Sequence, residues 1–259
     1  AAIGLAAAIL HERHGDVVVG SFAADHVVRD EAAFRAAVRA AEEIAAAGYV
    51  TTIGIAPTEP SSAFGYIEQG EPLPGLPGRS VARFVEKPDR ALAAEYLAGG
   101  RHLWNAGIFV MRTGVLLGAL ADLHPELAHG LARIAAAWDG PGRAEVLAEV
   151  WPTLDRMVID RAIAEPLGQL GRVAVVPADM GWSDIGDFAA LAELGDRPPT
   201  LAVGADGAWV HASKPVAVVG IPGAVVVETA EAILVTTRDH AQDVKAVVDQ
   251  LDGPLDGLR

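Results

Sequence analysis

The chain has 259 residues, of which 51% are hydrophobic and 21% charged, so it can bury a core and is not typical of a disordered protein. Acidic residues outnumber basic ones by 34 to 20 and no Lys/Arg-rich run occurs, which argues against a nucleic acid partner, because that affinity depends on neutralising phosphates. The absence of cysteine excludes disulfides, thiolate metal sites and cysteine nucleophiles, and it fits a cytoplasmic protein.

The first segment, Ala1–Leu10, is apolar but has neither a basic leader nor a cleavage pattern. Glu12 and Arg13 interrupt it well before the length that a bilayer requires. We therefore expect no membrane span here, and we interpret the segment as a buried helix that is entered partway along.

A strand, a helix and a second strand are predicted next. Val17–Ser21 is a short β-branched run of the kind that is buried on both faces of a sheet, and Asp25 follows its carboxyl end. Apolar residues at helical spacing predict a helix over Glu31–Ala47, with Asp30 as its N-cap. The apolar run Tyr49–Ile55 then predicts another strand.

The same alternation continues, with further strands predicted at Val81–Val85 and Ile108–Met111 and a helix between them at Ala91–Ala98. It predicts an α/β fold with a mostly parallel, Rossmann-like sheet and helices on its faces. In such sheets ligands bind beyond the carboxyl ends of the strands. The later elements are expected to be mainly helical, before a return to strand, over Thr113–Leu120, Leu131–Trp138, Arg143–Ala164 and Arg172–Val176.

Beyond Pro198 the sequence changes to short valine-rich segments separated by Gly, Pro and Ser. We predict a first domain over residues 1–198 and a small β-rich domain over 199–259, whose valine-rich surface is compatible with a homo-oligomer contact. A final helix is predicted over His240–Leu251, with Asp239 and Gln242 as a capping-box pair. The predicted strands are Trp209–His211, Val216–Val219, Ala224–Val227 and Ile233–Thr236.

Three common catalytic signatures are missing: a G-x-G-x-x-G turn after a strand, a Walker loop and a G-x-S-x-G elbow. Five other short segments, in their order and spacing, resemble the mannose-1-phosphate guanylyltransferases of the nucleotide-sugar pyrophosphorylase superfamily. The resemblance covers nearly the whole chain and is clearest from Val17 to Phe188. The segments are Val19–His26, Gly54–Thr58 with Phe64–Ile67, Phe84–Pro88, Trp104–Phe109 and Trp182–Phe188.

This resemblance implies an enzyme that makes GDP-mannose and pyrophosphate from GTP and mannose-1-phosphate, with Mg²⁺ as its cofactor. It also implies that the chain starts downstream of the family's Gly-rich nucleotide loop and its first strand, so we expect the chain alone to be inactive. Two alternatives stay open. One is a thymidylyl- or uridylyltransferase acting on glucose-1-phosphate, and the other is a non-catalytic regulatory subunit that binds GDP-mannose.

Three residues are predicted to be catalytic. Taken alone, Asp25 fits a turn or cap, and Asp184 fits the N-cap of the helix that follows it. Mg²⁺ prefers carboxylate and phosphate oxygens, so either residue is also a chemically sensible metal ligand. The resemblance implies that Asp25 and Asp184 both hold Mg²⁺ and that Lys87 binds the sugar phosphate.

The remaining predicted site residues concern the sugar. Glu86 ends a strand and fits an exposed position, but the resemblance places its carboxylate against sugar hydroxyls. It also implies that Asn105 reads a hydroxyl through an amide that both donates and accepts. Gly65 and Gly107 would let the backbone approach the ligand, and the Tyr66 ring would cover the sugar.

Overall fold

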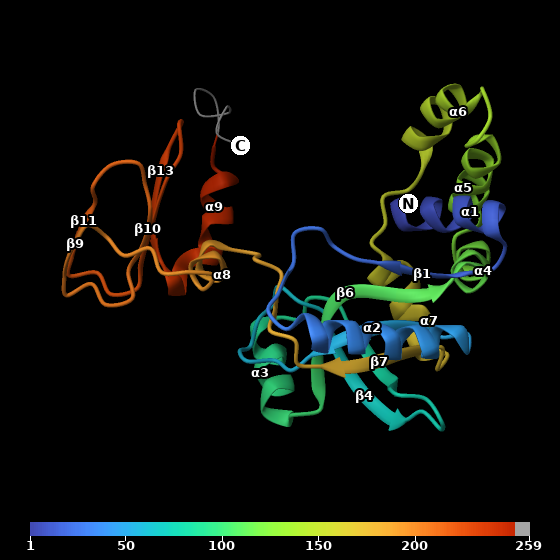
Figure 1. Cartoon of the computed structure of the whole chain (residues 1–259), viewed down its shortest axis with the longest axis horizontal. Coiled ribbons are helices and arrows are strands. Elements are labelled where there is room, and N and C mark those ends of the chain that lie inside the picture. The colour runs from blue at the N-terminus through green and yellow to red at the C-terminus, as the bar shows by residue number, and fades with distance from the viewer. Residues whose placement is uncertain (252–259) are drawn as a thin grey trace. The chain divides into compact units, whose positions relative to one another are not determined.

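The computed structural model describes residues 1–251, which form two units according to their contacts. The first unit contains Ala1–Ala24 and Val28–Trp182, and the second contains Asp25–Val27 and the chain from Ser183 onward. In Figure 1 the first unit runs from blue to yellow and the second is mainly orange to red. This division falls N-terminal to the domain boundary that the sequence predicts after residue 198.

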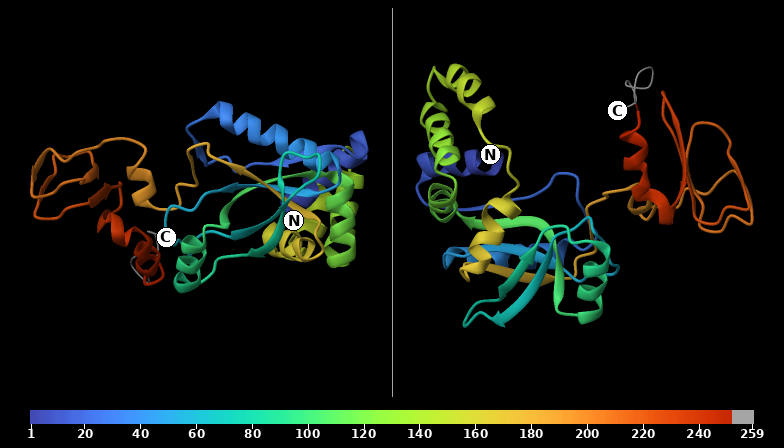
Figure 2. Two further views of the ribbon diagram at one scale, coloured as in Figure 1. Left: turned by 90° about the horizontal axis from the view of Figure 1, so that it is seen from below. Right: turned by 180° about the vertical axis from the view of Figure 1, so that it is seen from behind.

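A six-stranded sheet in the order β1-β6-β3-β7-β5-β4 forms the centre of the first unit (Figures 1 and 2). The α/β class is confirmed, with the correction that the sheet is mixed and not mostly parallel. Within this sheet β3 and β7 are parallel, and the other neighbours in the order pair antiparallel. The strands are β1 (Val18–Ser21), β3 (Val50–Ile55), β4 (Tyr66–Pro72), β5 (Arg79–Val85), β6 (His102–Arg112) and β7 (Val173–Ala178).

The antiparallel pairs arise from short connections. The loop over 73–78 joins β4 to β5, and it is too short for the crossover that a parallel pair needs. The strand β4 was not predicted, because Gly70 and Pro72 within it are poor strand formers. At the opposite side of the sheet, β1 pairs with β6 alone and is half-buried, whereas the sequence predicts burial on both faces.

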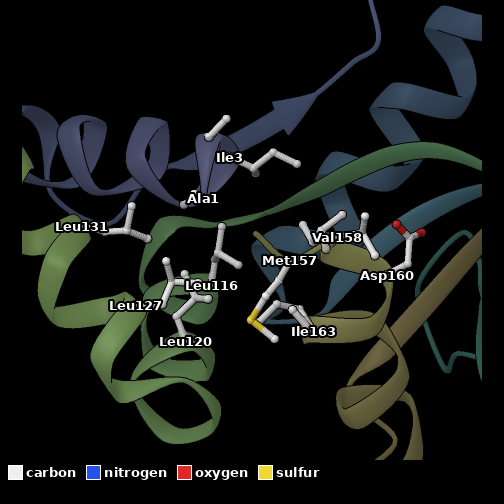
Figure 3. A pocket seen from close by; sticks show the side chains of 14 residues that line it. Ala1, Ile3, Leu116, Leu120, Leu127, Leu131, Met157, Val158, Asp160 and Ile163 are labelled. Carbon is white, nitrogen blue, oxygen red and sulfur yellow. The ribbon is translucent and has the colours of Figure 1, made fainter. Parts of the chain in front are cut away.

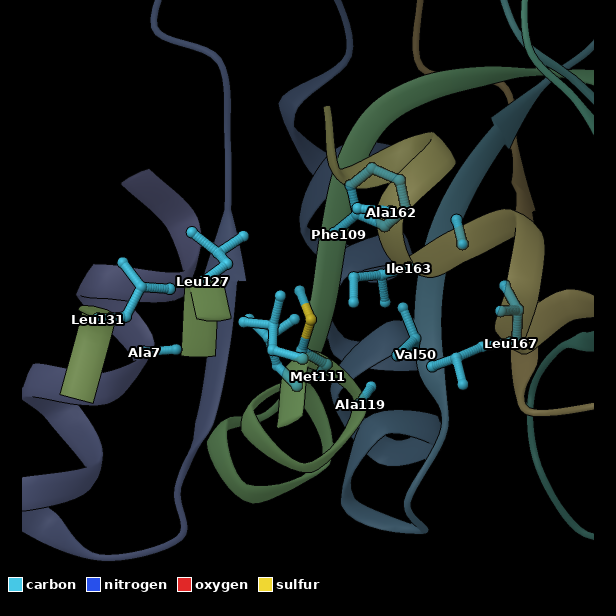
Figure 4. Packing of buried hydrophobic residues seen from close by; sticks show 14 of the residues in the cluster. Ala7, Val50, Phe109, Met111, Ala119, Leu127, Leu131, Ala162, Ile163 and Leu167 are labelled. Carbon is cyan, nitrogen blue, oxygen red and sulfur yellow. The ribbon is translucent and has the colours of Figure 1, made fainter. Parts of the chain in front are cut away.

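Helices cover both faces of the sheet. Val173 and Val175 of β7 pack into one apolar cluster with Ile163 and Leu167, which is shown in Figure 4. Ala174 and Val176, which point to the other face, pack into a second cluster with α2 (Glu31–Ala46). As predicted, Asp30 caps α2, where its carboxylate accepts a hydrogen bond of 2.9 Å from the Ala33 N–H.

The other helices of this unit are α1 (Ala2–His14), α3 (Arg90–Gly99), α4 (Thr113–Leu123), α5 (Pro125–Ala137), α6 (Arg143–Val150) and α7 (Glu165–Gln169). Gly4 brings α1 close to α5, since a Cβ added there would lie 2.7 Å from Leu131 Cδ1. An apolar cavity of about 310 Å³ lies at the start of α1 and extends to the segment around Asp160 (Figure 3).

The long helix predicted over Arg143–Ala164 is interrupted. After α6 the chain forms a 3₁₀ turn at Trp151–Thr153, then a loop, then a π-helical turn at Asp160–Ala164 that leads into α7. Pro152 explains the first break, because proline lacks the N–H that a continuing α-helix needs. The π-helical turn brings residues five apart onto one side of the chain.

The second unit is rich in short strands. Parallel pairs form between β9 (Leu201–Val203) and β11 (Ala217–Val219), and between β10 (Trp209–His211) and β12 (Ala224–Glu228). β13 (Ile233–Thr237) pairs antiparallel with β12. The helix α8 (Phe188–Ala192) also belongs to this unit. The two-residue strands β2 (Val27–Val28) and β8 (Trp182–Ser183) pair with each other, and the division between the units falls within both of them.

The end of the described chain differs from the predicted final helix. A 3₁₀ helix at Arg238–Asp243 comes first, and α9 (Val244–Val248) follows it. Asp239 lies inside the 3₁₀ helix and does not act as the predicted N-cap. Across residues 1–251, no helix is both long enough and apolar enough to cross a membrane.

Candidate functional site

In the first unit, the polar side chains that the sequence predicts to be functional lie at the carboxyl end of β5 and within β6. Glu86 and Lys87 follow β5 directly, and Asn105 lies within β6. The π-helical turn adds Asp160, and α7 adds Glu165. We call these five residues the β5–β6 polar cluster.

Hydrogen bonds hold both the nitrogen and the oxygen of the Asn105 side-chain amide. Its side chain is buried, and Nδ2 donates a hydrogen bond of 2.7 Å to Asp160 Oδ1. Its Oδ1 accepts from the Thr52 hydroxyl at 2.6 Å and from the Gly107 N–H at 3.3 Å. Gly107 has a φ of 68°, which explains why glycine occupies this irregular position of β6, where the register with β3 shifts.

Glu86 and Gly65 fit closely together. A Cβ added at Gly65 would lie 2.6 Å from Glu86 Oε2, so any larger residue would displace the carboxylate. The main-chain N–H of Glu86 donates to Glu165 Oε1 at 3.3 Å. The Glu86 side chain is only 12% exposed, and its Oε1 lies 3.5 Å from Lys87 Nζ.

Lys87 is both exposed and strained. Its side chain is 59% exposed, so its ammonium group is open to an anionic ligand. Its φ is 51°, in the left-handed region that side chains rarely adopt, and it directly precedes Pro88. Such conformations persist only where the surroundings enforce them, and they concentrate at functional sites.

The carboxylates of the cluster share an unfavourable environment. Burial raises the pKa of Glu86, and the negative charge of Asp160 raises it further. Burial also raises the pKa of Asp160, which lies at the edge of the apolar cavity in Figure 3, while Lys87 and the Asn105 hydrogen bond lower it in part. Lys87 therefore offsets the charge of both acidic side chains, and Arg161 contributes at Glu86.

Tyr66 does not face this cluster with an open ring. Its side chain is fully buried, and its hydroxyl donates to the Ser61 carbonyl at 3.0 Å. The ring therefore has no exposed surface in this structure, and its predicted role as a cover over the sugar stays a prediction. A polar cavity of about 440 Å³ lies beside Glu86 and is lined also by Arg83, Arg161 and Gln169.

The second unit holds Asp184 in a tight turn. Asp184 Oδ1 accepts from the Gly186 N–H at 3.1 Å, and the Ser183 hydroxyl accepts from the Ile185 N–H at 3.2 Å. Ile185 between them has a φ of 49°. Asp187, not Asp184, caps α8, because its carboxylate accepts from the Ala190 N–H at 2.9 Å.

Asp25 is exposed and belongs to the same unit as Asp184. Within residues 1–251, no group of three or more His, Asp or Glu side chains is placed to hold a metal. Two carboxylates suit Mg²⁺, which commonly binds one or two protein carboxylates and completes its shell with water and substrate phosphates. The carboxylates of Asp25 and Asp184 therefore suit a Mg²⁺ ion that water and substrate phosphates also coordinate, and not an ion enclosed by protein ligands alone.

Sequence reasoning missed Asp160, Glu165 and Thr52. The two acidic residues lie five positions apart around the apolar run Ala162–Ala164, a spacing that places them on different faces of an ordinary helix. A π-helical turn changes that relation, and both contact the cluster. The sequence signal that was available for Asp160 and Glu165 is that two acidic residues flank a short apolar stretch.

Comparisons with known proteins show which proteins the chain resembles. The model of the nucleotidyl transferase family matches residues 1–197, and that of the MannoseP isomerase/GMP-like beta-helix domain matches residues 200–251. A Xanthan biosynthesis protein from Xanthomonas campestris is 35% identical over 96% of this chain and 54% of its own length. A mannose-1-phosphate guanylyltransferase from Klebsiella pneumoniae is 36% identical over 95% of this chain and 54% of its own.

A solved structure extends the similarity. It is described as a mannose-1-phosphate geranyltransferase from Thermus thermophilus, with a TM-score of 0.80, 29% identity, and coverage of 96% of this chain and 74% of the other. The chain spans about half the length of the curated relatives that it matches. With a family model that matches residues 1–197, on a fold of the same architecture, the chain belongs to the nucleotidyl transferase family.

Proposed function

We propose that the protein to which this chain belongs transfers a guanylyl group from GTP to mannose-1-phosphate, forming GDP-mannose and pyrophosphate. The observation that carries this is the β5–β6 polar cluster, in which half-buried carboxylates and a buried amide adjoin one exposed lysine. Carboxylates and amides bind hydroxyl groups, and an ammonium group binds phosphate. The relatives named mannose-1-phosphate guanylyltransferase support the choice of sugar and nucleotide.

In the proposed reaction a phosphate oxygen of mannose-1-phosphate forms a bond to the α-phosphorus of GTP, and the bond from that phosphorus to the pyrophosphate leaving group breaks. No protein nucleophile is needed. Reactions of this type depend on in-line positioning and on neutralising the charge that develops. Lys87 would bind the sugar phosphate, because its side chain is 59% exposed and carries a compact positive charge.

Glu86 and Asn105 would orient the sugar. Glu86 presents a carboxylate that Gly65 leaves room for, and the polar cavity of about 440 Å³ beside it suits a hydroxylated ligand. For the metal, Asp25 and Asp184 would hold Mg²⁺, which when bound would neutralise phosphate charge. The turn around Asp184 supports this role, since α8 takes its cap from Asp187 and leaves Asp184 available for another purpose.

The test uses the product of the longest open reading frame that contains this sequence. Pyrophosphate release is followed with GTP, UTP, dTTP or ATP against mannose-1-phosphate and glucose-1-phosphate, each with Mg²⁺ and with EDTA. We expect the highest kcat/KM for GTP with mannose-1-phosphate, and no turnover in EDTA.

A preference for glucose-1-phosphate with dTTP or UTP would overturn the proposed substrates. Binding of GDP-mannose with no pyrophosphate release would instead favour the regulatory subunit. Lys87→Ala serves as the loss-of-function control, with circular dichroism to establish that its fold is unchanged.

A further inference from the structure

The hydrogen bonds of Asn105 leave its amide with a single unused group. A primary amide offers an oxygen with two acceptor positions and a nitrogen with two N–H donors. The oxygen receives the Thr52 hydroxyl and the Gly107 N–H, and one N–H is donated to Asp160. One N–H therefore remains, so Asn105 faces a ligand as a donor only and not as the donor and acceptor that the resemblance implies.

Two of the three partners determine which way the amide points. Asp160 presents a carboxylate oxygen at 2.7 Å, which in its ionised form only accepts hydrogen bonds. Gly107 presents a main-chain N–H at 3.3 Å, which only donates. A flipped amide would set its oxygen against the Asp160 carboxylate and its N–H groups against the Gly107 N–H, losing both contacts.

Thr52 by itself would tolerate either orientation. Its hydroxyl, which is completely buried, lies 2.6 Å from Asn105 Oδ1 and 2.9 Å from the Ile108 carbonyl. A hydroxyl can donate or accept, so it could donate to Ile108 and accept from a flipped amide. The orientation of Asn105 therefore depends on the ionised carboxylate of Asp160 together with the Gly107 N–H.

We propose that Asp160 is a positioning residue of the sugar pocket, which orients Asn105 so that its one remaining N–H is donated to a hydroxyl oxygen of a sugar phosphate. The inference rests on the proposed function for the identity of that ligand. Asp160 sits on the π-helical turn, next to the apolar cavity, where its burial favours a fixed hydrogen bond over exchange with water. It acts through Asn105 and needs no contact with the reacting atoms.

The chain offers a direct test, because Asn105 is its only asparagine. The 259-residue protein labelled with ¹⁵N in the asparagine side chain gives one pair of NH₂ signals. In the wild type we expect two well-separated proton shifts, with one proton exchanging slowly with water because it is bonded to the carboxylate. Asp160→Ala should collapse the separation and remove the slow exchange. Asp160→Asn, which keeps an acceptor of the same shape and adds a second pair of signals of its own, should retain part of both for Asn105.

The second measurement is a titration of the same samples with mannose-1-phosphate. We expect binding to shift the other NH₂ proton of the wild type and Asp160→Ala to weaken affinity by roughly threefold to tenfold, the scale of losing a hydrogen bond between neutral groups. Asp160→Asn should restore part of the affinity. Asp155→Ala, an exposed acid on the loop before the π-helical turn, is the matched control and should change neither signal nor affinity.

The outcomes separate the two proposals. If the Asn105 NH₂ signals are unchanged in both Asp160 variants, the positioning role is overturned, whether or not the affinity for mannose-1-phosphate changes. Altered signals with wild-type affinity would also overturn it, since orientation would then not matter for the sugar. If neither the 259-residue protein nor the product of the longest open reading frame binds mannose-1-phosphate, the proposed function is overturned, while the spectra without ligand still report whether Asp160 orients Asn105.

Discussion

The β5–β6 polar cluster and the Asp184 turn hold their polar side chains in different ways. In the cluster, Asn105 accepts hydrogen bonds from Thr52 and Gly107 and donates one to Asp160, and these three bonds fix its amide. In the turn, Asp184 is half-buried, and its carboxylate bonds to the main chain only two residues away. A network of distant partners fixes one orientation of a neutral group, whereas a local turn holds a charge at the surface of its unit.

The two regions share one property. Lys87 and Ile185 are the only non-glycine residues within 1–251 that have a positive φ, and they lie in these two regions. Each such residue costs about 1–2 kcal/mol relative to an ordinary conformation. Backbone strain at both places indicates that the surrounding structure holds each segment in a shape that its sequence alone would not choose.

The largest expected effect concerns the turn. Asp184→Asn should lower turnover at least about a hundredfold, because it removes a metal-binding charge with little change in shape. Its matched control is Asp187→Asn, three residues away. Asparagine caps helices as well as aspartate does, so this variant should keep α8 and its activity.

Both variants would be measured by pyrophosphate release in the product of the longest open reading frame, with circular dichroism for the fold. Near-wild-type activity in Asp184→Asn would refute its role in metal binding. Equal losses in the two variants would mean that the turn matters for its shape and not for the charge of Asp184.

A smaller effect separates neighbours in the cluster. Lys87→Ala should raise the KM for mannose-1-phosphate by roughly tenfold to a hundredfold, since a charge-assisted contact with phosphate is lost. Glu86→Gln should mainly reduce discrimination between mannose- and glucose-1-phosphate, because a carboxylate meets hydroxyl groups and not phosphate. Steady-state kinetics on both sugars distinguish the two, and identical profiles would contradict this division of roles.

The pH dependence of stability tests the cost of the buried acids. The pKa values of Glu86 and Asp160 are raised in the folded state, so the folded protein binds their protons more tightly than the unfolded chain does. The stability that these groups contribute is fully present below about pH 4, near their ordinary pKa values, and is lost as the pH rises through the folded values. The Glu86→Gln/Asp160→Asn variant should therefore be more stable than the wild type at pH 7, with a difference that shrinks toward pH 4.

Urea unfolding between pH 4 and pH 8 measures this difference. Asp16→Asn provides a control of opposite sign, because the Gly114 N–H and the Arg112 guanidinium lower the pKa of Asp16. That variant should be less stable than the wild type at pH 7, with a deficit that narrows as the pH falls. Parallel curves for the wild type and the double variant would show that burial of the two acids has no energetic consequence.

The sequence predicts which segments form helices and strands better than it predicts which strands pair and whether the pairs are parallel. The helix at α2, its Asp30 cap and the strands around it follow from local residue patterns, and the structure has them. The alternation of strands and helices does not specify which strands pair, so the mixed sheet and the β4–β5 hairpin were not predicted. Pairing depends on the lengths of connections and on distant neighbours, which no local pattern encodes.

The site shows the same limit. Glu86, Lys87 and Asn105 lie in one cluster, as the motifs predict. Asp160 joins this cluster because it lies on a π-helical turn, which no residue pattern in the sequence predicted. Tyr66 follows Gly65 in the sequence, yet its ring turns into the core and bonds to Ser61. Motifs identify chemistry-bearing residues, whereas hydrogen-bond partners and burial depend on the tertiary fold.

The smallest expected effect tests the strain at Ile185. Ile185→Ala removes most of a half-buried side chain and keeps a Cβ in the left-handed conformation, whereas Ile185→Gly removes the same contacts and the steric conflict as well. Glycine is ordinarily no more stabilising than alanine, because it has more conformational freedom to lose on folding. Here the order should reverse, and Ile185→Gly should exceed Ile185→Ala in free energy of unfolding by about 1 kcal/mol. Urea unfolding of the two variants measures this difference. The reference is Ala189→Gly in α8 compared with the wild type, where alanine should be the more stabilising residue because the position is helical. If Ile185→Gly is the less stable of the two, the turn is not strained at Ile185, and the Asp184 carboxylate is held by its hydrogen bond to the Gly186 N–H alone.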